Sequence, residues 1–459
     1  MKYMPLTVTR LVLTLGLLLL VGLPAFAQKT VSITCRCVAD GTNSTQVEWL
    51  RNWVIPNFEA MMEEQDNPVS VELIEFGGTD EALKEQYALD LSVGQGADVL
   101  GFDGFWVPEF VGAGTLLPLS EVAGAEVDSW EGWSHIPEGL QSLLGYDGQL
   151  YGIALGTDSR MIFYRKDMFA EAGIANEEDW RPESWEEVLE AARTIKETFP
   201  ESVPLQLNAG TAMGEATTMQ GYWMALLGTG EEMTDADGRW IVRSQGILDT
   251  LNLYQQIYVD EALGDARIQL LQDGRNRSFE NFRDGVTAML VESDYFYRSV
   301  VAPDADFALE DRDAQLGWAP MPAREPGAGI RGQDIVNISG GTGFVLNPNA
   351  ENPQEAWALL AFMNSREALV AAQEIEPRVR VRDDVPVPGD AFLTTTADTL
   401  LPLTTSRPNS EYYAQVSVEA QLMTERVVSG EMTPEEAMDA YASAVVSLVG
   451  EENTVSLLE

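Results

Sequence analysis

The sequence predicts an α/β protein built as two lobes. β-prone runs alternate with helical periodicity along the first hundred residues, an alternation typical of a parallel sheet covered by helices. The chain has 459 residues, and the part that follows an N-terminal leader, about 430 residues, exceeds what one hydrophobic core usually holds. Hydrophobic residues make up 45% of the chain, which is an ordinary share for a folded globular protein.

The first 27 residues have the pattern of a signal peptide. Lys2 and Arg10 form a positive region, Leu11 to Leu23 is apolar, and Ala25-Phe26-Ala27 is a small-x-small cleavage site. A membrane anchor is the alternative, but the apolar run is shorter than the ~20 residues that a span needs. We therefore expect a soluble protein in the periplasm or extracytoplasmic space. We do not expect a lipoprotein, because neither cysteine of the chain follows a lipoprotein-like box of small residues.

The charge of the chain limits its partners. Lys and Arg number 28 against 73 Asp and Glu, so the formal net charge is −45. A field of this sign disfavours nucleic acid and anionic membrane surfaces, and we expect neither as a partner. The acid excess fits a protein from a salt-rich habitat and a generic acidic secreted protein equally well.

The two cysteines, Cys35 and Cys37, are i and i+2 on one face of a β-prone run. Within one strand this spacing is unfavourable for a relaxed bridge, and two lone thiols make a weak metal site. We therefore expect buried thiols and no structural disulfide.

The first half of the chain reads strand, helix, strand, helix, strand. In order, these elements are Val31 to Val38, Gln46 to Glu64, Val69 to Phe76, Thr79 to Val93, and Ala97 to Phe102. The carboxyl ends of such parallel strands meet at one edge, where ligands bind. Asp40 follows the first strand, and Asp103 and Trp106 follow the third, so all three are candidate binding residues. A helix cap is the alternative for Asp103, and core packing is the alternative for Trp106.

A polar break interrupts two apolar runs in the next segment. Leu150 to Leu155 and Met161 to Tyr164 are strand-like, and Gly156 to Arg160 separates them. A buried charge is costly without a partner, so Asp158 and Arg160 are expected to face a cleft and to pair with each other.

The second half adds helices, a strand and a glycine pair. The expected elements are helices from Ser184 to Thr198, Thr217 to Leu227, Ser244 to Tyr258, Pro353 to Asn364 and from Tyr412 onward, with strands at Leu205 to Leu207, Val286 to Val291 and Phe344 to Asn347. Trp318 to Pro322 reads as part of a Pro/Gly-rich connection.

Within this half, Trp223, Tyr295 and Tyr297 are candidate aromatic contacts. Tyr295 and Tyr297 belong to three consecutive aromatics at a strand end, of which at least one should face a cleft, since alternate residues face different sides. Gly340 and Gly341 permit close approach of the backbone to a ligand, although a tight turn needs glycines equally.

The chain resembles the solute-binding proteins of ATP-driven sugar importers, the family that includes maltose- and trehalose-binding proteins. The fragments that carry the resemblance occur in the family's order along the mature chain: Gly96 to Val99, Gly114 to Leu119, Asp147 to Ile153, Phe163 to Phe169, Ser184 to Glu187, Phe282 to Met289, Gly340 to Phe344, and Glu355 to Trp357. The chain departs from the family pattern at Ala154, where proline is frequent, and at Arg165, where asparagine is common. Tyr295 to Tyr297 replace a frequent tryptophan, so the family's ligand does not transfer with the resemblance.

The resemblance implies a two-lobed clamshell of the periplasmic-binding-protein type II kind, each lobe a mixed sheet flanked by helices. The chain is then expected to cross between lobes three times, near Ile153 to Asp158, Val291 to Tyr295 and Gln373 to Arg378. Lobe 1 would comprise residues 28–153 and 294–373, and lobe 2 residues 154–293 and 374–459. Relatives touch sugar where Asp103, Tyr295 to Tyr297, Gly340-Gly341 and Arg378 are expected to lie.

The function implied is an extracytoplasmic carbohydrate receptor. It would deliver a sugar or oligosaccharide to the permease subunits of an ABC importer, as a monomer, by ligand-induced closure of the lobes. A receptor for a polyol, peptide or other small solute is the alternative, and a secreted glycan-active enzyme using two acids is the rival class. The sequence contains no HExxH, nucleophile elbow, phosphate loop or dinucleotide fingerprint, so we expect no enzyme, no cofactor and no metal.

Overall fold

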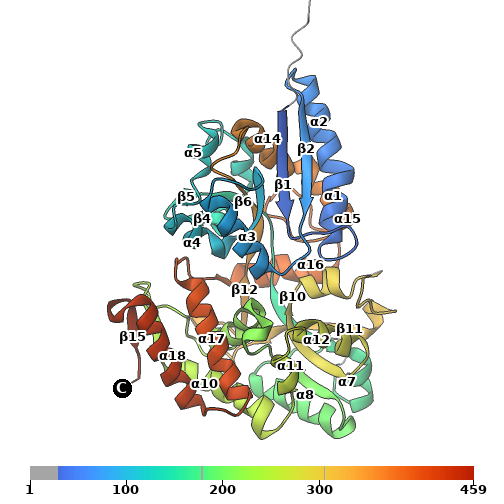
Figure 1. The fold of residues 1–459 in the computed structure, drawn as a ribbon. Coiled ribbons are helices and arrows are strands. Elements are labelled where there is room, and N and C mark those ends of the chain that lie inside the picture. Colours follow the sequence, from blue (N-terminus) through green and yellow to red (C-terminus); the bar gives the residue numbers. More distant parts are fainter. Residues whose placement is uncertain (1–28, 177–178, 304, 459) are drawn as a thin grey trace, which may run out of the picture.

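Two mixed β-sheets, each with its own hydrophobic core, form two lobes (Figure 1). This computed structural model describes residues 29–176, 179–303 and 305–458. The predicted signal peptide lies outside the described residues. The α/β class and the two-lobed architecture predicted from the sequence are confirmed.

Lobe 1 is built on a five-stranded sheet of order β2-β1-β3-β13-β6. The strands are β1 (Lys29–Cys35), β2 (Val69–Glu75), β3 (Val99–Asp103), β6 (Gly152–Thr157) and β13 (Gly341–Leu346). The parallel pairing expected for the first three strands is confirmed, since β1 runs parallel to both β2 and β3. β13 pairs antiparallel with β3 and β6, which makes the sheet mixed.

Helices surround this sheet, and most of them bury apolar side chains in the core of lobe 1. They are α1 (Ser44–Trp49), α2 (Ile55–Glu64), α3 (Asp80–Ser92), α4 (Val107–Gly112), α5 (Leu119–Ala123), α6 (Glu138–Gln141), α14 (Pro353–Met363) and α15 (Arg366–Ile375). In α3, Leu83, Tyr87 and Leu91 are buried at i, i+4 and i+8, as one face of an amphipathic helix requires. The hydroxyl of Thr79 accepts from the Ala82 N–H at 3.2 Å and caps this helix.

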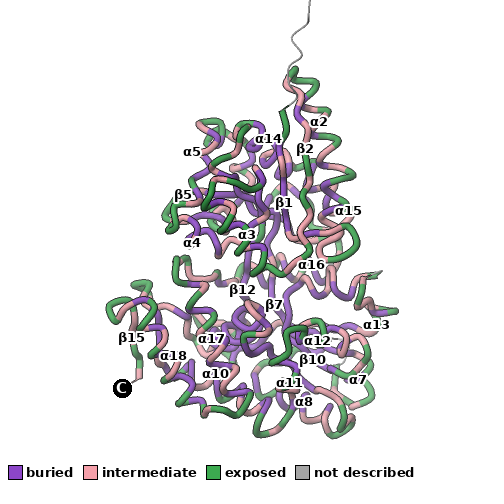
Figure 2. The backbone as a smooth tube through the Cα atoms, in the orientation of Figure 1, coloured by how far each residue is buried: buried purple, intermediate pink, exposed green. Residues whose placement is uncertain are grey.

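Lobe 2 is built on a six-stranded sheet of order β14-β12-β11-β7-β10-β8. The strands are β7 (Arg160–Arg165), β8 (Val203–Gln206), β10 (Thr287–Ser293), β11 (Leu316–Pro322), β12 (Ile335–Ser339) and β14 (Thr404–Ser406). β7 and β10 are buried along their whole length because helices cover both faces (Figure 2). Two small sheets pair β4 (Gly145–Tyr146) with β5 (Gln149–Leu150), and β9 (Trp240–Arg243) with β15 (Thr454–Ser456).

The helices of lobe 2 pack on both faces of this sheet. They are α7 (Lys166–Ala172), α8 (Trp185–Thr198), α9 (Trp223–Gly228), α10 (Gln245–Gln255), α11 (Ala266–Gln269), α12 (Gly274–Arg283), α13 (Arg312–Gln315), α16 (Ala391–Thr395), α17 (Tyr413–Val428) and α18 (Pro434–Val449). Gly173 ends α7 in the left-handed conformation, at φ 71°, as a glycine after the last turn of a helix commonly does. None of the described helices combines the length and apolarity needed to cross a membrane.

Short π and 3₁₀ segments join or extend these helices. They are η1 (Leu50–Val54), η2 (Gly104–Trp106), η3 (Glu131–His135), η4 (Ser142–Leu144), η5 (Thr211–Met213), η6 (Thr217–Tyr222), η7 (Gln256–Asp260), η8 (Phe296–Val300), η9 (Ile330–Gly332), η10 (Thr396–Leu400), η11 (Leu401–Leu403) and η12 (Glu451–Asn453). η6 and η8 are π segments, a rare helical form that is frequent at functional sites.

The chain passes between the two sheets at three places. It leaves β6 and enters β7 through Asp158 and Ser159, and it leaves β12 and enters β13 through Gly340. The third passage lies between α15, which packs in the core of lobe 1, and α16, which packs in lobe 2.

The expected second crossing, at Val291 to Tyr295, is wrong. β11 and β12 fall within residues 294–373, which we assigned to lobe 1, yet both pair in the sheet of lobe 2. Trp318 to Pro322, expected to be a connection, is most of β11. Prolines are depleted in strands, so Pro320 and Pro322 hid this strand from the sequence pattern. Pro320 nevertheless pairs with Met161 of β7, because tertiary context overrides the low strand preference of proline. The other limits that we gave for the two lobes stay predictions.

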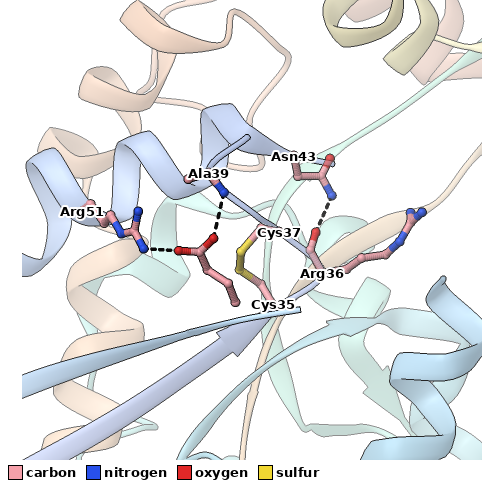
Figure 3. The surroundings of a disulfide bond; sticks show 7 residues. Cys35, Arg36, Cys37, Ala39, Asn43 and Arg51 are labelled. Carbon is pink, nitrogen blue, oxygen red and sulfur yellow. Dashed lines mark hydrogen bonds and ion pairs between the residues drawn. A yellow bond between two sulfur atoms is a disulfide. The ribbon is translucent and has the colours of Figure 1, made fainter. Parts of the chain in front are cut away.

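The expectation of no disulfide is also wrong, because Cys35 and Cys37 are joined (Figure 3). Cys35 is the last residue of β1, and beyond it the backbone turns, with the Cys37 N–H donating to the Cys35 carbonyl at 2.8 Å. The two Cα atoms are 5.3 Å apart, within the range that a bridge spans. The i, i+2 argument fails here because the two residues do not share one extended strand.

Candidate functional site

A cavity of about 280 Å³ lies between the lobes, at the ends of strands and at the passages between sheets. Lobe 1 contributes Asp103 at the end of β3, and lobe 2 contributes Ser293 at the end of β10. The passages contribute Asp158 and Gly340. The cavity is therefore lined by residues whose relative positions depend on how the lobes are arranged.

Asp158 and Arg160 form the buried pair that the sequence predicts. The Arg160 guanidinium donates to the Asp158 carboxylate at 2.5 Å and to the carbonyl of Ile338 at 3.1 Å. The Gly340 N–H donates to the same carboxylate oxygen at 2.5 Å, so the pair ties the first passage to the second. Burial alone would raise the pKa of Asp158, but Arg160 and the Gly340 N–H outweigh it and lower that pKa below its ordinary value.

Asp103 joins the two lobes directly. Its carboxylate accepts from Arg407, which follows β14 of lobe 2, at 2.6 Å, and from the Phe105 N–H at 3.4 Å. Both interpretations considered for Asp103 therefore hold, since it caps η2 and also faces the cavity. Burial raises the pKa of Asp103 to about 6, although Arg407 acts in the opposite direction.

Two of the predicted aromatics line the cavity. Trp106 is 3% exposed and packs edge-on against Phe102, with ring centroids 5.2 Å apart, so it belongs to the core of lobe 1 as well as to the cavity wall. Tyr295 follows β10 and is half-buried. Burial raises the pKa of its hydroxyl, so it is protonated and able to donate at neutral pH.

Glycines allow side chains to approach the passages closely. A Cβ added at Gly340 would lie 3.0 Å from a guanidinium nitrogen of Arg407 and 3.4 Å from the Asp158 carboxylate. A Cβ added at Gly156 would lie 2.6 Å from Nε of Arg378. Gly341, which also lines the cavity, faces Leu143 in the same way. Neither Gly340 nor Gly341 lies in a turn or has a positive φ, so the tight turn considered for this pair is absent, and close approach of its backbone to a ligand stays a prediction.

Arginines dominate the charged lining of the cavity, although the chain as a whole is strongly acidic. Seven line it, namely Arg36, Arg160, Arg275, Arg298, Arg378, Arg380 and Arg407, against five carboxylates, namely Asp80, Asp103, Asp158, Glu215 and Glu376. Five of the seven form ion pairs: Arg36 with Asp80, Arg160 with Asp158, Arg275 with Glu292, Arg298 with both Asp294 and Glu376, and Arg407 with Asp103. Most of the cationic charge in the cavity wall is thus compensated by protein carboxylates.

Three predicted site residues lie away from this cavity. Asp40 is exposed in the loop after β1. Trp223 is 1% exposed within the core of lobe 2. Tyr297 stacks on Phe392 at 4.1 Å and donates to Asp390 at 2.8 Å, and it packs against a hydrophobic cluster of lobe 2. The cavity therefore brings together Asp103, Trp106, Asp158, Arg160, Tyr295, Gly340, Gly341 and Arg378.

Several lining residues escaped the sequence analysis. Arg407 lies in a loop, and Glu215 lies in the helical turn that leads into η6. Only the folded chain brings the two residues together, 3.6 Å apart. Arg380 did leave a signal: it is the middle arginine of the alternating run Arg378 to Arg382, in a chain with few basic residues.

One possible metal-ligand group occurs among the described residues, and it lies away from the cavity. His135, Asp383 and Asp384 hold their ligand atoms within 4.8 Å of one another. Asp384 already accepts twice from Arg382, at 2.8 Å each, and nothing else at the group indicates a ligand. The expectation of no metal stays a prediction.

Asp103 gives the protein a testable pH dependence. Its pKa of about 6 in the folded protein exceeds the ordinary value of 3.8, so the folded state binds this proton more tightly than the unfolded chain does. Its contribution to the free energy of unfolding should therefore rise as pH falls from about 7 toward 5. We expect urea unfolding to show this gain for the wild type relative to Asp103→Asn, because the amide has no proton to take up over this pH range.

A two-lobed fold with a polar cavity at the passages between lobes defines a class of ligand-binding proteins. A model of the bacterial extracellular solute-binding protein family matches residues 42–369. The chain therefore belongs to that family, which confirms the resemblance found in the sequence. This is a family of solute-binding proteins rather than enzymes, and its members are extracellular.

Sequence relatives and solved structures agree with this assignment. A protein of Brucella abortus (strain 2308), named as a binding protein, is 26% identical over 285 residues, which is 62% of this chain and 62% of that protein. The chain thus matches less than two thirds of that relative's length. The arabinooligosaccharide-binding protein of Halalkalibacterium halodurans is 24% identical over 282 residues, 60% of this chain and 56% of that protein.

Among solved structures, an ABC transporter solute-binding protein from Thermotoga lettingae TMO, bound with α-D-tagatose, is 26% identical. Its TM-score is 0.75, over 92% of this chain and 100% of that chain. A maltose-bound protein of T. maritima has a TM-score of 0.71 at 19% identity, over 92% of this chain and 100% of that chain. The second likeness shows the fold alone.

Proposed function

We propose that this protein is an extracytoplasmic receptor that binds a carbohydrate between its lobes and delivers it to the permease of an ABC importer. The observation that carries the proposal is the cavity at the three passages, lined by polar side chains of both lobes beside Trp106 and Tyr295. A sugar offers hydroxyls around its ring and apolar C–H faces, so it needs such bidentate polar groups beside flat aromatics. The sugar-bound relative from Thermotoga lettingae supports the same ligand class.

The residues that would hold the sugar follow from the cavity wall. Asp103, Asp158 and Arg160 would bond its hydroxyls, while Trp106 and Tyr295 would pack on its faces. Gly340 and Gly341 would let the sugar approach the backbone, and Arg378 would reach it from the third passage. Asp40, Trp223 and Tyr297 have no place in this proposal because they lie outside the cavity.

Binding would then drive closure. A ligand that touches residues of both lobes makes its full set of contacts only when the lobes are together, so it shifts the population toward the closed form. In this structure the lobes already touch through Asp103 and Arg407, and through Asn409, which donates to the Gly145 carbonyl at 3.2 Å. The closed shape is what a permease would recognise. We further propose that the protein acts as a monomer.

The test is a ligand panel on the mature protein. Thermal unfolding should shift upward with a sugar, because a ligand at 100 times its Kd stabilises the native state by about 2.7 kcal/mol. Small-angle scattering should show a smaller radius of gyration in the same sample. If neither changes with any mono- or oligosaccharide, but a polyol or peptide produces both effects, the carbohydrate assignment is wrong. Products formed from labelled oligosaccharides would instead indicate an enzyme.

A further inference from the structure

Two arginines of the cavity wall, Arg378 and Arg380, stand out because they lack an ion-pair partner among the described residues. Arg380 is 8% exposed, and its Nη2 donates to the carbonyl of Glu376 at 2.9 Å. Arg378 donates to the Thr157 carbonyl at 3.4 Å, while its buried Nε has no hydrogen-bond partner. Their contacts with the protein are mainly to neutral oxygens.

The carboxylates nearest to them are paired with other cations. Asp158 pairs with Arg160, and both Asp294 and Glu376 pair with Arg298. Burial, then repulsion from Arg298, lowers the pKa of Arg378. Burial, then repulsion from Arg378, lowers the pKa of Arg380 to about 9, so it is still charged at neutral pH. The third passage thus presents two cations to the cavity that form no ion pair of their own, although Glu376, which pairs with Arg298, also attracts both.

The local chain fixes both side chains on the same side. Val379 between them is buried in the core of lobe 2, so Arg378 and Arg380 face the opposite way in the extended segment. Gln373 holds the segment, because its Oε1 accepts from the Arg378 N–H at 2.8 Å and from Arg380 Nε at 3.4 Å. The next arginine of the alternation, Arg382, does not line the cavity and has a bidentate carboxylate partner, Asp384.

Buried cations of this kind are expensive unless an anion pairs with them, and guanidinium groups suit the planar, bidentate geometry of oxyanions. We propose that the ligand is an anionic sugar whose oxyanion group, a carboxylate or a phosphate, pairs with Arg378 and Arg380. This inference rests on the proposed carbohydrate receptor function and specifies its substrate class. The negative field of the whole chain does not oppose it, because the cavity wall itself is rich in arginine.

Calorimetry on the mature protein tests the ligand class. The probes are mono- to trisaccharides in three matched series: neutral sugars such as galactose and glucose, their uronic acids, and sugar phosphates such as glucose 6-phosphate. We expect one of the two acid series to bind at least roughly 30-fold more tightly than its neutral parents. This factor is the lower end of the affinity loss seen when a buried charge pair loses one partner. Preference for the uronic acids identifies a carboxylate, and preference for the phosphates identifies a phosphate. A neutral sugar that binds as tightly as its acid overturns the inference but leaves the carbohydrate receptor function standing, whereas no binding by any sugar overturns the carbohydrate assignment on which the inference rests.

Substitution of Arg380 separates a ligand-binding role from a structural one. Arg380→Met removes a buried charge that has no ion-pair partner, so we expect a higher Tm for the unliganded protein. We also expect roughly 30-fold weaker binding of the anionic sugar and a much smaller loss for its neutral parent. The matched control Arg382→Met should lower the Tm, because it strands Asp384, and should leave the preference for the acid unchanged. A fall in Tm for Arg380→Met equal to that of the control, or an unchanged preference for the acid, would show that Arg380 is architectural.

Discussion

Arg298→Ala is expected to lower the free energy of unfolding by about 3 kcal/mol or more, the largest loss that we foresee for one substitution. Arg298 is 5% exposed and pairs with Asp294, which is fully buried, and with Glu376. Its removal leaves two carboxylates without that cation in a place that water reaches poorly. Urea unfolding followed by circular dichroism measures the effect.

An exposed arginine with the same number of partners provides the control. Arg277 on α12 pairs with Asp273 at 3.0 Å and Glu280 at 3.2 Å, but its side chain is 55% exposed. Arg277→Ala should therefore cost less than about 1 kcal/mol, as exposed pairs do. Equal losses for Arg277→Ala and Arg298→Ala would contradict the argument from burial.

The loss of unfolding free energy caused by Arg298→Ala should also depend on pH. Burial would raise the pKa of Glu376, but Arg298, Arg378 and Arg380 lower it to about 2. A lowered carboxyl pKa contributes stability above the ordinary value of 4.5, and that contribution is lost as pH falls from about 4.5 toward 2. The difference between wild type and Arg298→Ala should therefore shrink over this window.

The parts of the fold that the sequence predicts are those set by local pattern. The alternation of apolar runs with helical periodicity gave the parallel strands of lobe 1, and the strand-end rule placed Asp103 at the cavity. Asp158 and Arg160 were found because two charges inside an apolar stretch require a polar neighbour. β11 was missed because its prolines oppose the strand propensity that its pairing with β7 overrides.

The parts of the site that the sequence could not predict depend on residues distant along the chain. Arg407 meets Asp103 across 304 positions, and no periodicity in its loop indicates that contact. Tyr295 and Tyr297 are two positions apart, yet Tyr295 lines the cavity and Tyr297 stacks on Phe392, because the chain turns into η8 between them. A run of aromatics at a strand end indicates a site but does not indicate which ring faces it.

Asp158→Ala should affect both stability and binding, because Asp158 bonds two of the three passages to each other. The Arg160 side chain, which is 7% exposed, then keeps the Ile338 carbonyl as an acceptor but has no carboxylate partner. The Gly340 N–H also loses its acceptor. We expect a loss of about 3 kcal/mol in the free energy of unfolding, and weaker binding of whichever solute raises the Tm of the wild type.

Two further substitutions separate charge from connection. Asp158→Asn keeps an oxygen that can accept from the Gly340 N–H but removes the charge, so its loss should be intermediate. Asp167→Ala breaks the ion pair between Arg165, the last residue of β7, and Asp167, but Asp167 is 50% exposed and Arg165 keeps the carbonyls of Phe282 and Arg283 as acceptors. Its effect on stability should be below about 1 kcal/mol, with solute affinity unchanged. If Asp158→Ala weakens stability no more than Asp167→Ala and leaves affinity intact, then the passages are held together by backbone pairing alone, and closure does not depend on the polar residues between the sheets.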